Sequence, residues 1–176
     1  MLWNDEALSK KINSGIFPGV QGSVMLHIVA GKAACLGEAL RPEFKVYNQA
    51  VLDNARALAS VLSDAGICIV AGGTDTGLML VALSDRGITG DLAAAALERA
   101  GLAVNKNQIP FDPHPAEAPS GLRLSSNAGT TRGFAVSEFQ GIGHWIDRVL
   151  QDPADTQVTA DVRQEVLALC KRYTIY

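Results

Sequence analysis

The chain has 176 residues, 48% of them hydrophobic, and its mean hydropathy of +0.14 is typical of a globular protein rather than a disordered one. Its formal net charge of −3 argues against non-specific binding to nucleic acid, which requires a basic surface. No apolar run approaches the roughly 20 residues of a membrane-spanning helix, and the polar start, MLWNDEALSKKIN, suits neither a signal peptide nor an anchor. Three dispersed cysteines indicate reduced thiols and a cytoplasmic protein.

Two helices separated by a loop are expected at the start of the chain. Residues 4–12 suit a helix, and apolar residues recur at helical spacing from Val24 to about Leu40. Between them lies SGIFPGVQGS, residues 14–23, where glycine and proline favour a loop with unusual backbone angles.

A long helix and a small sheet are expected next. Pro42 suits the first turn of a helix that should run to Asp64, and the apolar runs at 67–73 and 78–83 predict two short buried strands. The other expected elements are a helix at 91–100, a strand at 103–107, a proline-rich loop at 108–120, a strand at 121–125 and helices at 137–151 and 160–172. Helices packed on a small, mostly antiparallel sheet predict a two-layer α/β (α+β) sandwich.

Arg123 is the first candidate for a binding residue. It lies between Leu122 and Leu124 on an expected strand, so its side chain should face the opposite side of the sheet from the two leucines. In a cleft, a guanidinium there could hold a carboxylate through two parallel hydrogen bonds. The alternative is a surface arginine or one paired with an internal acid, and composition alone favours that alternative.

Two polar segments are further candidates. Asn105, Lys106 and Asn107 end a strand and could hydrogen-bond a heterocycle, although strand ends are commonly polar and solvated. The loop from Pro18 to Ser23 precedes a helix, so its backbone N–H groups could hold an anion. The alternative is a tight turn that simply needs glycine.

The histidines give no clear sign of catalysis. His27 and His144 lie on expected helices, where they suit packing or solvent exposure. His114 stands alone in the proline-rich loop, and a single histidine does not make a metal site. No nucleophile–histidine–acid set, zinc cluster or P-loop is present, so no metal ligand is predicted.

Two longer motifs resemble one enzyme family. VNKNQIPFDP, residues 104–113, and SGLRLSSNAGTTRGF, residues 120–134, are similar to the substrate- and folate-binding end of serine hydroxymethyltransferase, a pyridoxal phosphate (PLP) enzyme. The resemblance covers the chain from Asn4 onward and implies a C-terminal portion of a fold-type-I PLP enzyme. It makes residues 1–41 (helix, glycine-rich loop, helix) the end of the large domain and residues 42–176 the C-terminal small domain.

The resemblance also implies roles for individual residues. Arg123, on the family's SGxR motif, would bind the carboxylate of serine or glycine, and Asn107 would contact the pterin of tetrahydrofolate, the co-substrate. Gly22 and Ser23, on the family's PGxQGGP loop, would contact the PLP phosphate bound by the other subunit of a homodimer. The family's PLP-bonding lysine precedes the matched region, so the chain is expected to be inactive without a lysine-bearing N-terminal half.

Several positions depart from the family pattern. Ser23-Val24 replaces Gly-Pro, and Thr76-Gly77 replaces the Asn-His of GTDNH. Two further runs differ, PAEAPSG replacing SPFVTSG and Ser125-Ser126-Asn127-Ala128 replacing GTPA, whereas TTRGF is retained. These differences leave three alternatives open: a paralogue acting on another amino acid such as an α-methylated serine, one half of a split enzyme, or a free-standing non-catalytic protein that binds a small amino acid or folate.

Apolar residues near the start of the chain are expected to be exposed when the chain is alone. Exposed apolar patches drive association, so a dimer or higher oligomer is expected. The candidates are Leu2, Trp3, Ile16, Phe17 and Leu26.

Overall fold

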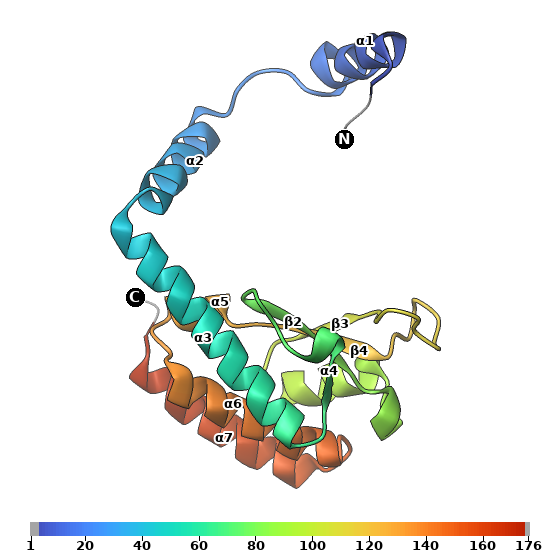
Figure 1. Ribbon diagram of the computed structural model, residues 1–176, viewed down its shortest axis with the longest axis vertical. Coiled ribbons are helices and arrows are strands. Elements are labelled where there is room, and N and C mark those ends of the chain that lie inside the picture. Colours follow the sequence, from blue (N-terminus) through green and yellow to red (C-terminus); the bar gives the residue numbers. More distant parts are fainter. Residues whose placement is uncertain (1–3, 175–176) are drawn as a thin grey trace. The chain divides into compact units, whose positions relative to one another are not determined.

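The structure is a computed structural model that describes residues 4–174. It forms two compact units, one ending at Phe44 and the other beginning at Lys45. The first unit contains helices α1 (Glu6–Ser14) and α2 (Leu26–Ala39), joined by a wide turn and an extended segment (Figure 1). The Asp5 carboxylate accepts a hydrogen bond from the N–H of Leu8 at 2.9 Å and so caps α1.

Neither helix of the first unit contains a buried residue. Ile16, Phe17 and Leu26 are 48%, 66% and 74% exposed, as expected for this apolar surface. Leu2 and Trp3, the other two candidates, lie outside the described residues. In the isolated chain, the first unit therefore exposes apolar side chains to solvent.

The second unit is built on a four-stranded antiparallel sheet with strand order β1-β2-β4-β3. Its strands are β1 (Cys68–Ile69), β2 (Leu78–Ala82), β3 (Asn105–Asn107) and β4 (Gly121–Ser125). The strand at 121–125 is confirmed, whereas the strand expected at 67–73 pairs only at its first residues. Ala71 and Gly72 have φ values of 64° and 74°, which turn the chain away from the sheet.

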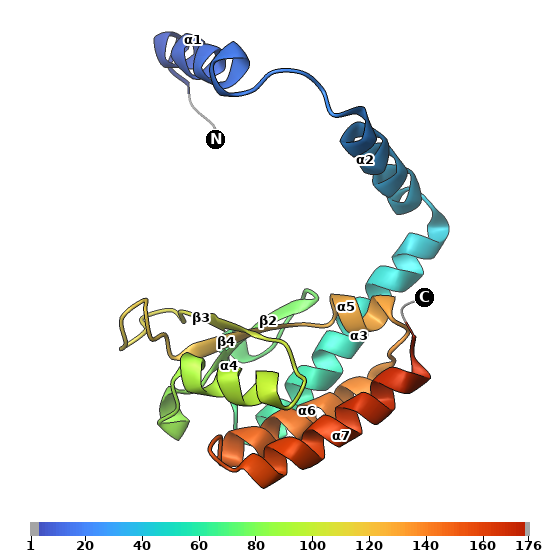
Figure 2. The same ribbon diagram turned by 180° about the vertical axis from the view of Figure 1, so that it is seen from behind.

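Long helices cover one face of this sheet. They are α3 (Pro42–Asp64), with its predicted bounds, α4 (Gly90–Arg99), α6 (Val136–Gln151) and α7 (Thr156–Arg172). The five-residue helix α5 (Asn127–Thr131) was not predicted. Figures 1 and 2 show α6 and α7 side by side along the covered face. The structure therefore confirms the two-layer α/β sandwich.

The start of α7 was wrongly predicted. The carboxylate of Asp155 accepts hydrogen bonds from the N–H groups of Gln157 and Val158, so the helix begins at Thr156 rather than near 160. Asp161, which lies near the expected start, is inside the helix and accepts a hydrogen bond from the Gln157 side chain.

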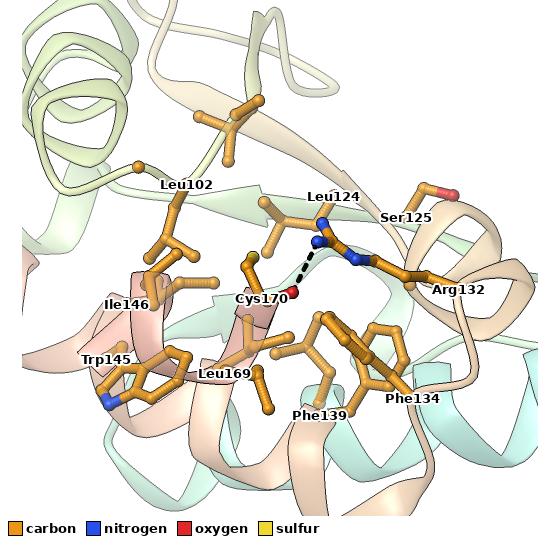
Figure 3. Close-up of a pocket in the computed structure, with 17 residues that line it drawn as sticks. Leu102, Leu124, Ser125, Arg132, Phe134, Phe139, Trp145, Ile146, Leu169 and Cys170 are labelled. Atoms are coloured by element: carbon orange, nitrogen blue, oxygen red, sulfur yellow. Dashed lines mark hydrogen bonds between the residues drawn. The ribbon is translucent and has the colours of Figure 1, made fainter. Parts of the chain in front are cut away.

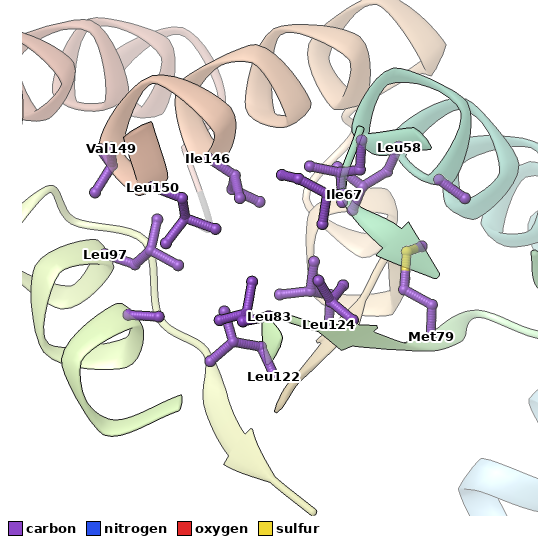
Figure 4. Packing of buried hydrophobic residues seen from close by; sticks show 14 of the residues in the cluster. Leu58, Ile67, Met79, Leu83, Leu97, Leu122, Leu124, Ile146, Val149 and Leu150 are labelled. Atoms are coloured by element: carbon purple, nitrogen blue, oxygen red, sulfur yellow. The ribbon is translucent and has the colours of Figure 1, made fainter. Parts of the chain in front are cut away.

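The core lies between the sheet and these helices. Leu122 and Leu124 point from β4 toward Ile146 and Leu150 of α6 (Figure 4), and Leu122 is fully buried. The opposite face of the sheet carries the alternate residues of β2 and β4, which are exposed or half-buried except for buried Gly121. Among residues 4–174, no helix is long and apolar enough to cross a membrane.

Candidate substrate-binding face

Arg123 lies on the open face of the sheet. Its neighbours on β4, Leu122 and Leu124, are buried on the covered face, whereas Arg123 is exposed, as the alternation of the strand predicts. Leu80 and Asn105 are its register partners on the two flanking strands. Its guanidinium forms no hydrogen bond or ion pair with any residue between 4 and 174. The group is therefore available for a ligand.

The asparagine-lysine-asparagine run of β3 is divided between the two faces. Asn105 and Asn107 lie opposite Arg123 and Gly121, so they share the open face with Arg123. Lys106 lies on the covered face, where its Nζ pairs with Asp91 Oδ1 at 2.6 Å and donates to the Glu117 carbonyl at 3.2 Å. The open face therefore combines one unpaired guanidinium with two amides. Lys106 is held on the other face by its contacts with Asp91 and Glu117.

The loop that connects β3 to β4 folds over the edge of the open face. A Cβ added to Gly121 would lie 2.5 Å from Cγ2 of Ile109, so this isoleucine packs directly on the strand that carries Arg123. Asn107 donates from Nδ2 to the Gln108 carbonyl at 2.6 Å, which fixes the orientation of its amide. The loop thus determines the width of the face between Asn107 and Arg123.

One carboxylate holds this loop closed. Asp112 accepts hydrogen bonds from the N–H groups of Ile109 (3.2 Å), His114 (3.0 Å) and Ser120 (2.9 Å). It also accepts one from the Ser120 hydroxyl at 2.6 Å, and His114 Nδ1 lies 2.7 Å from that same hydroxyl. This cluster was not predicted from the sequence, although an aspartate followed by proline is a common signal for a turn that a side chain closes.

Protonation of Asp112 should loosen the loop. Burial by itself would raise the pKa of this carboxyl, but the hydrogen bonds from Ser120, His114 and Ile109 together hold it well below its usual range. Because the folded pKa lies below the unfolded value of about 3.9, the stabilisation is complete above about pH 4 and is lost as the pH falls further. We therefore expect Asp112→Asn to lower the melting temperature at pH 7 and to make it less sensitive to acid.

Melting curves between about pH 2 and pH 7 measure this effect. The control is Asp53→Asn, which alters an exposed carboxylate on α3 that accepts a 2.8 Å hydrogen bond from the Gln49 side chain. The difference between wild type and Asp112→Asn should narrow toward low pH. An equal difference at every pH would contradict the assigned role of Asp112.

Gly22 and Ser23 lie in the first unit, just before α2. Their N–H groups, and that of Val24, donate to no acceptor within the described part of the chain. Ser23 has a φ of 57°, and a Cβ added to Gly22 would meet no atom within 4 Å. Free amides in an open loop before a helix can donate hydrogen bonds to an anion. This loop belongs to the first unit, whereas Arg123 belongs to the second.

Four residues that depart from the family pattern lie in one contact cluster. A Cβ added to Gly77 would lie 2.5 Å from Asn127 Oδ1 and 2.5 Å from Val51 Cγ1, so the Asn127 side chain fills the space beside Gly77. The Ser125 hydroxyl donates to the same Oδ1 at 2.9 Å, and the Ser126 N–H donates to the Gly77 carbonyl at 2.9 Å. The side chains at these positions therefore fit one another in the folded chain.

The remaining histidines have no site around them. His27 and His144 are exposed on α2 and α6. Within residues 4–174, no group of three histidine, cysteine, aspartate or glutamate side chains could hold a metal ion. The open face of the second unit therefore offers one cationic group and two amides.

Known proteins match the whole chain. The family model described as "Serine hydroxymethyltransferase" matches residues 4–146. The chain is 53% identical over 179 residues to the serine hydroxymethyltransferase of Hyphomonas neptunium, and the match covers 100% of the chain and 41% of that relative. Matches to the enzyme of Sphingopyxis alaskensis (52% identical) and to serine hydroxymethyltransferase 2 of Rhodospirillum rubrum (50%) also cover 100% of the chain and 42% of each relative. The chain thus spans about two fifths of the length of these curated relatives. It belongs to the serine hydroxymethyltransferase family.

Proposed function

We propose that this chain supplies the amino-acid and folate contacts of an enzyme that interconverts serine and glycine with tetrahydrofolate. The observation that carries the proposal is the unpaired, exposed guanidinium of Arg123 on the open face of the sheet. Two parallel hydrogen bonds from this group fix both the position and the plane of a substrate carboxylate. Such orientation brings the reacting carbon of the amino acid into a defined place and lowers the entropic part of the barrier.

Asn107 is the proposed contact for the pterin of tetrahydrofolate. Its Nδ2 is held by the Gln108 carbonyl, which leaves Oδ1 to accept a hydrogen bond from the heterocycle. Asn105 offers a second amide on the same face. The two amides of β3 lie on the same face as the Arg123 guanidinium. This arrangement suits a co-substrate that must bind next to the amino acid.

Pyridoxal phosphate, when bound, supplies the electron sink for this chemistry. The free amides of Gly22 and Ser23 fit its phosphate, and in a homodimer they would reach the cofactor held by the other subunit. Lys10 is not the proposed reacting lysine, because it is 77% exposed and pairs with Glu6 at 3.1 Å. We infer that a lysine-bearing segment outside the chain holds the cofactor and that the chain alone is not catalytic.

Arg123→Lys tests the carboxylate assignment. The variant is made in a fusion of this chain to the preceding part of the Hyphomonas neptunium relative, and glycine binding is measured by calorimetry. A single ammonium cannot reproduce the planar fork of a guanidinium, so the dissociation constant should rise by roughly 10- to 100-fold. The control is Arg163→Lys, on α7, whose guanidinium donates to the Arg99 carbonyl on the covered side. Unchanged glycine affinity in Arg123→Lys would contradict the assignment.

Mixing experiments separate the possible arrangements. Turnover on adding a separately purified lysine-bearing part would identify a two-piece enzyme. Folate binding without turnover, in the mixture and in the fusion alike, would instead favour a non-catalytic paralogue.

A further inference from the structure

A second possible site lies on the covered side of the sheet, away from Arg123. A cavity of about 250 Å³ opens between the connection from α4 to β3, strand β4 and helices α6 and α7. Its floor is formed by buried Leu124, Ile146 and Leu169, and its rim includes the exposed residues Gly101 and Ala103. Figure 3 shows Leu102 and Ile146 on one side of this space and Arg132 on the other.

Arg132 gives the rim a positive charge. It belongs to the retained TTRGF run, to which the proposed function assigns no role. Its Nε donates to the Tyr173 carbonyl at 2.5 Å. Its Nη2 donates to the Cys170 carbonyl at 2.9 Å (Figure 3). The guanidinium carbon also lies 5.8 Å from the ring centre of Phe134. These contacts hold the guanidinium in place beside the cavity.

No described residue neutralises this charge. The contacts of Arg132 are two neutral carbonyls and an aromatic ring, and the residue forms no ion pair within 4–174. Its Nη1 donates to no acceptor in that range, so at least one N–H group remains for a ligand. A half-buried cation without a carboxylate partner favours the binding of an anion.

The size of the cavity limits the ligand. An apolar cavity of about 150 Å³ is large enough to bind benzene, so the larger space here can hold one ring with a small substituent. Apolar walls with one fixed polar group are the usual design of a small-molecule site. We propose that this cavity binds a small hydrophobic carboxylate, a monocyclic aromatic or branched aliphatic acid, with its apolar part on Leu124 and Ile146 and its carboxylate at Arg132.

Benzoate and benzyl alcohol test the proposal, because they have similar shapes and only benzoate is charged. Each is titrated into the full 176-residue chain with labelled leucine methyl groups, observed by NMR. We expect benzoate to shift the methyl signals of Leu102, Leu124 and Leu169 with a dissociation constant of about 1 mM or below. Benzyl alcohol should bind at the same residues about tenfold more weakly, since it lacks the charge-assisted bonds.

Three variants complete the test. Leu102→Trp fills the half-buried upper side of the cavity and should abolish binding of both compounds. Arg132→Met should reduce benzoate affinity to that of benzyl alcohol and leave benzyl alcohol unchanged. The control Arg99→Met removes a guanidinium that also donates to a backbone carbonyl, that of Pro153 at 2.8 Å, but lies outside the cavity lining, and it should change neither affinity.

Several results would overturn the proposal. They are equal affinity of the wild-type chain for the two compounds, signal changes only outside the cavity, and benzoate binding that survives Leu102→Trp. The wild-type comparison does not depend on whether Arg132→Met folds. Because the site lies on the other side of the sheet from Arg123, its failure would leave the proposed substrate face intact.

Discussion

Gly121→Ala is expected to destabilise the second unit by about 3 kcal/mol or more, the upper end of the range for overpacking. The new Cβ would lie 2.5 Å from Ile109 Cγ2, 2.8 Å from the Asn107 carbonyl oxygen and 2.9 Å from the Val81 carbonyl oxygen. The two carbonyls belong to the strands on either side of β4, so neither can move without disturbing the hydrogen-bond ladder. A side chain therefore cannot be accommodated by a simple rotamer change.

The same substitution should weaken ligand binding, because Gly121 separates Asn107 from Arg123 on the open face. Denaturant unfolding measures the stability, and glycine and folate titrations of the fusion protein measure the binding. The control is Gly141→Ala on α6, where an added Cβ meets no atom within 4 Å. That variant should be stabilised by roughly 0.5–1 kcal/mol through helix propensity. A Gly121→Ala protein as stable as wild type would contradict the close contacts described around Gly121 in β4.

Gly77→Ala should cost about 1–3 kcal/mol, for a related reason. Its Cβ would lie 2.5 Å from Asn127 Oδ1, at the end of a side chain that can rotate, and 2.5 Å from Cγ1 of Val51, which is only 4% exposed. Removal of the asparagine side chain should relieve the first overlap and leave the second. The combined variant Gly77→Ala/Asn127→Ala should therefore be more stable than the sum of the two single changes predicts, by about 1 kcal/mol.

Unfolding free energies of the wild type, the two single variants and the double variant form the cycle that measures this coupling. Gly73→Ala is a suitable control in the same turn, because nothing lies within 4 Å of its added Cβ. Strict additivity of Gly77→Ala and Asn127→Ala would mean that the two replacements are independent.

The open-face position of Arg123 could be predicted because it depends on a local rule. Alternation along Leu122-Arg123-Leu124 places the cation opposite two core residues, and Pro42 marks the start of α3 in the sequence. The start of α7 could not be chosen in this way, since Asp155 and Asp161 are both good caps and only the folded hydrogen bonds distinguish them.

Contacts between distant residues account for what the sequence did not reveal. Gly77 and Asn127 are joined only through the pairing of β2 with β4, and neither residue type by itself signals a partner. The closed loop at Asp112 depends on a φ of 57° at Phe111, a conformation that a bulky residue rarely adopts and that propensity does not predict. The cavity beside Arg132 arises from five separate segments and has no sequence motif of its own.

The fusion of this chain to the preceding part of the Hyphomonas neptunium relative provides the most direct measurement. Formation of glycine from serine is followed in the purified fusion with pyridoxal phosphate and tetrahydrofolate, beside the same fusion carrying Arg123→Lys. We predict clear turnover in the unmodified fusion. In the fusion with Arg123→Lys, kcat/KM for serine should be at least about tenfold lower. A folded fusion that binds the cofactor yet forms no glycine, or one in which Arg123→Lys is fully active, would contradict the role of this chain as the substrate-binding part of the enzyme.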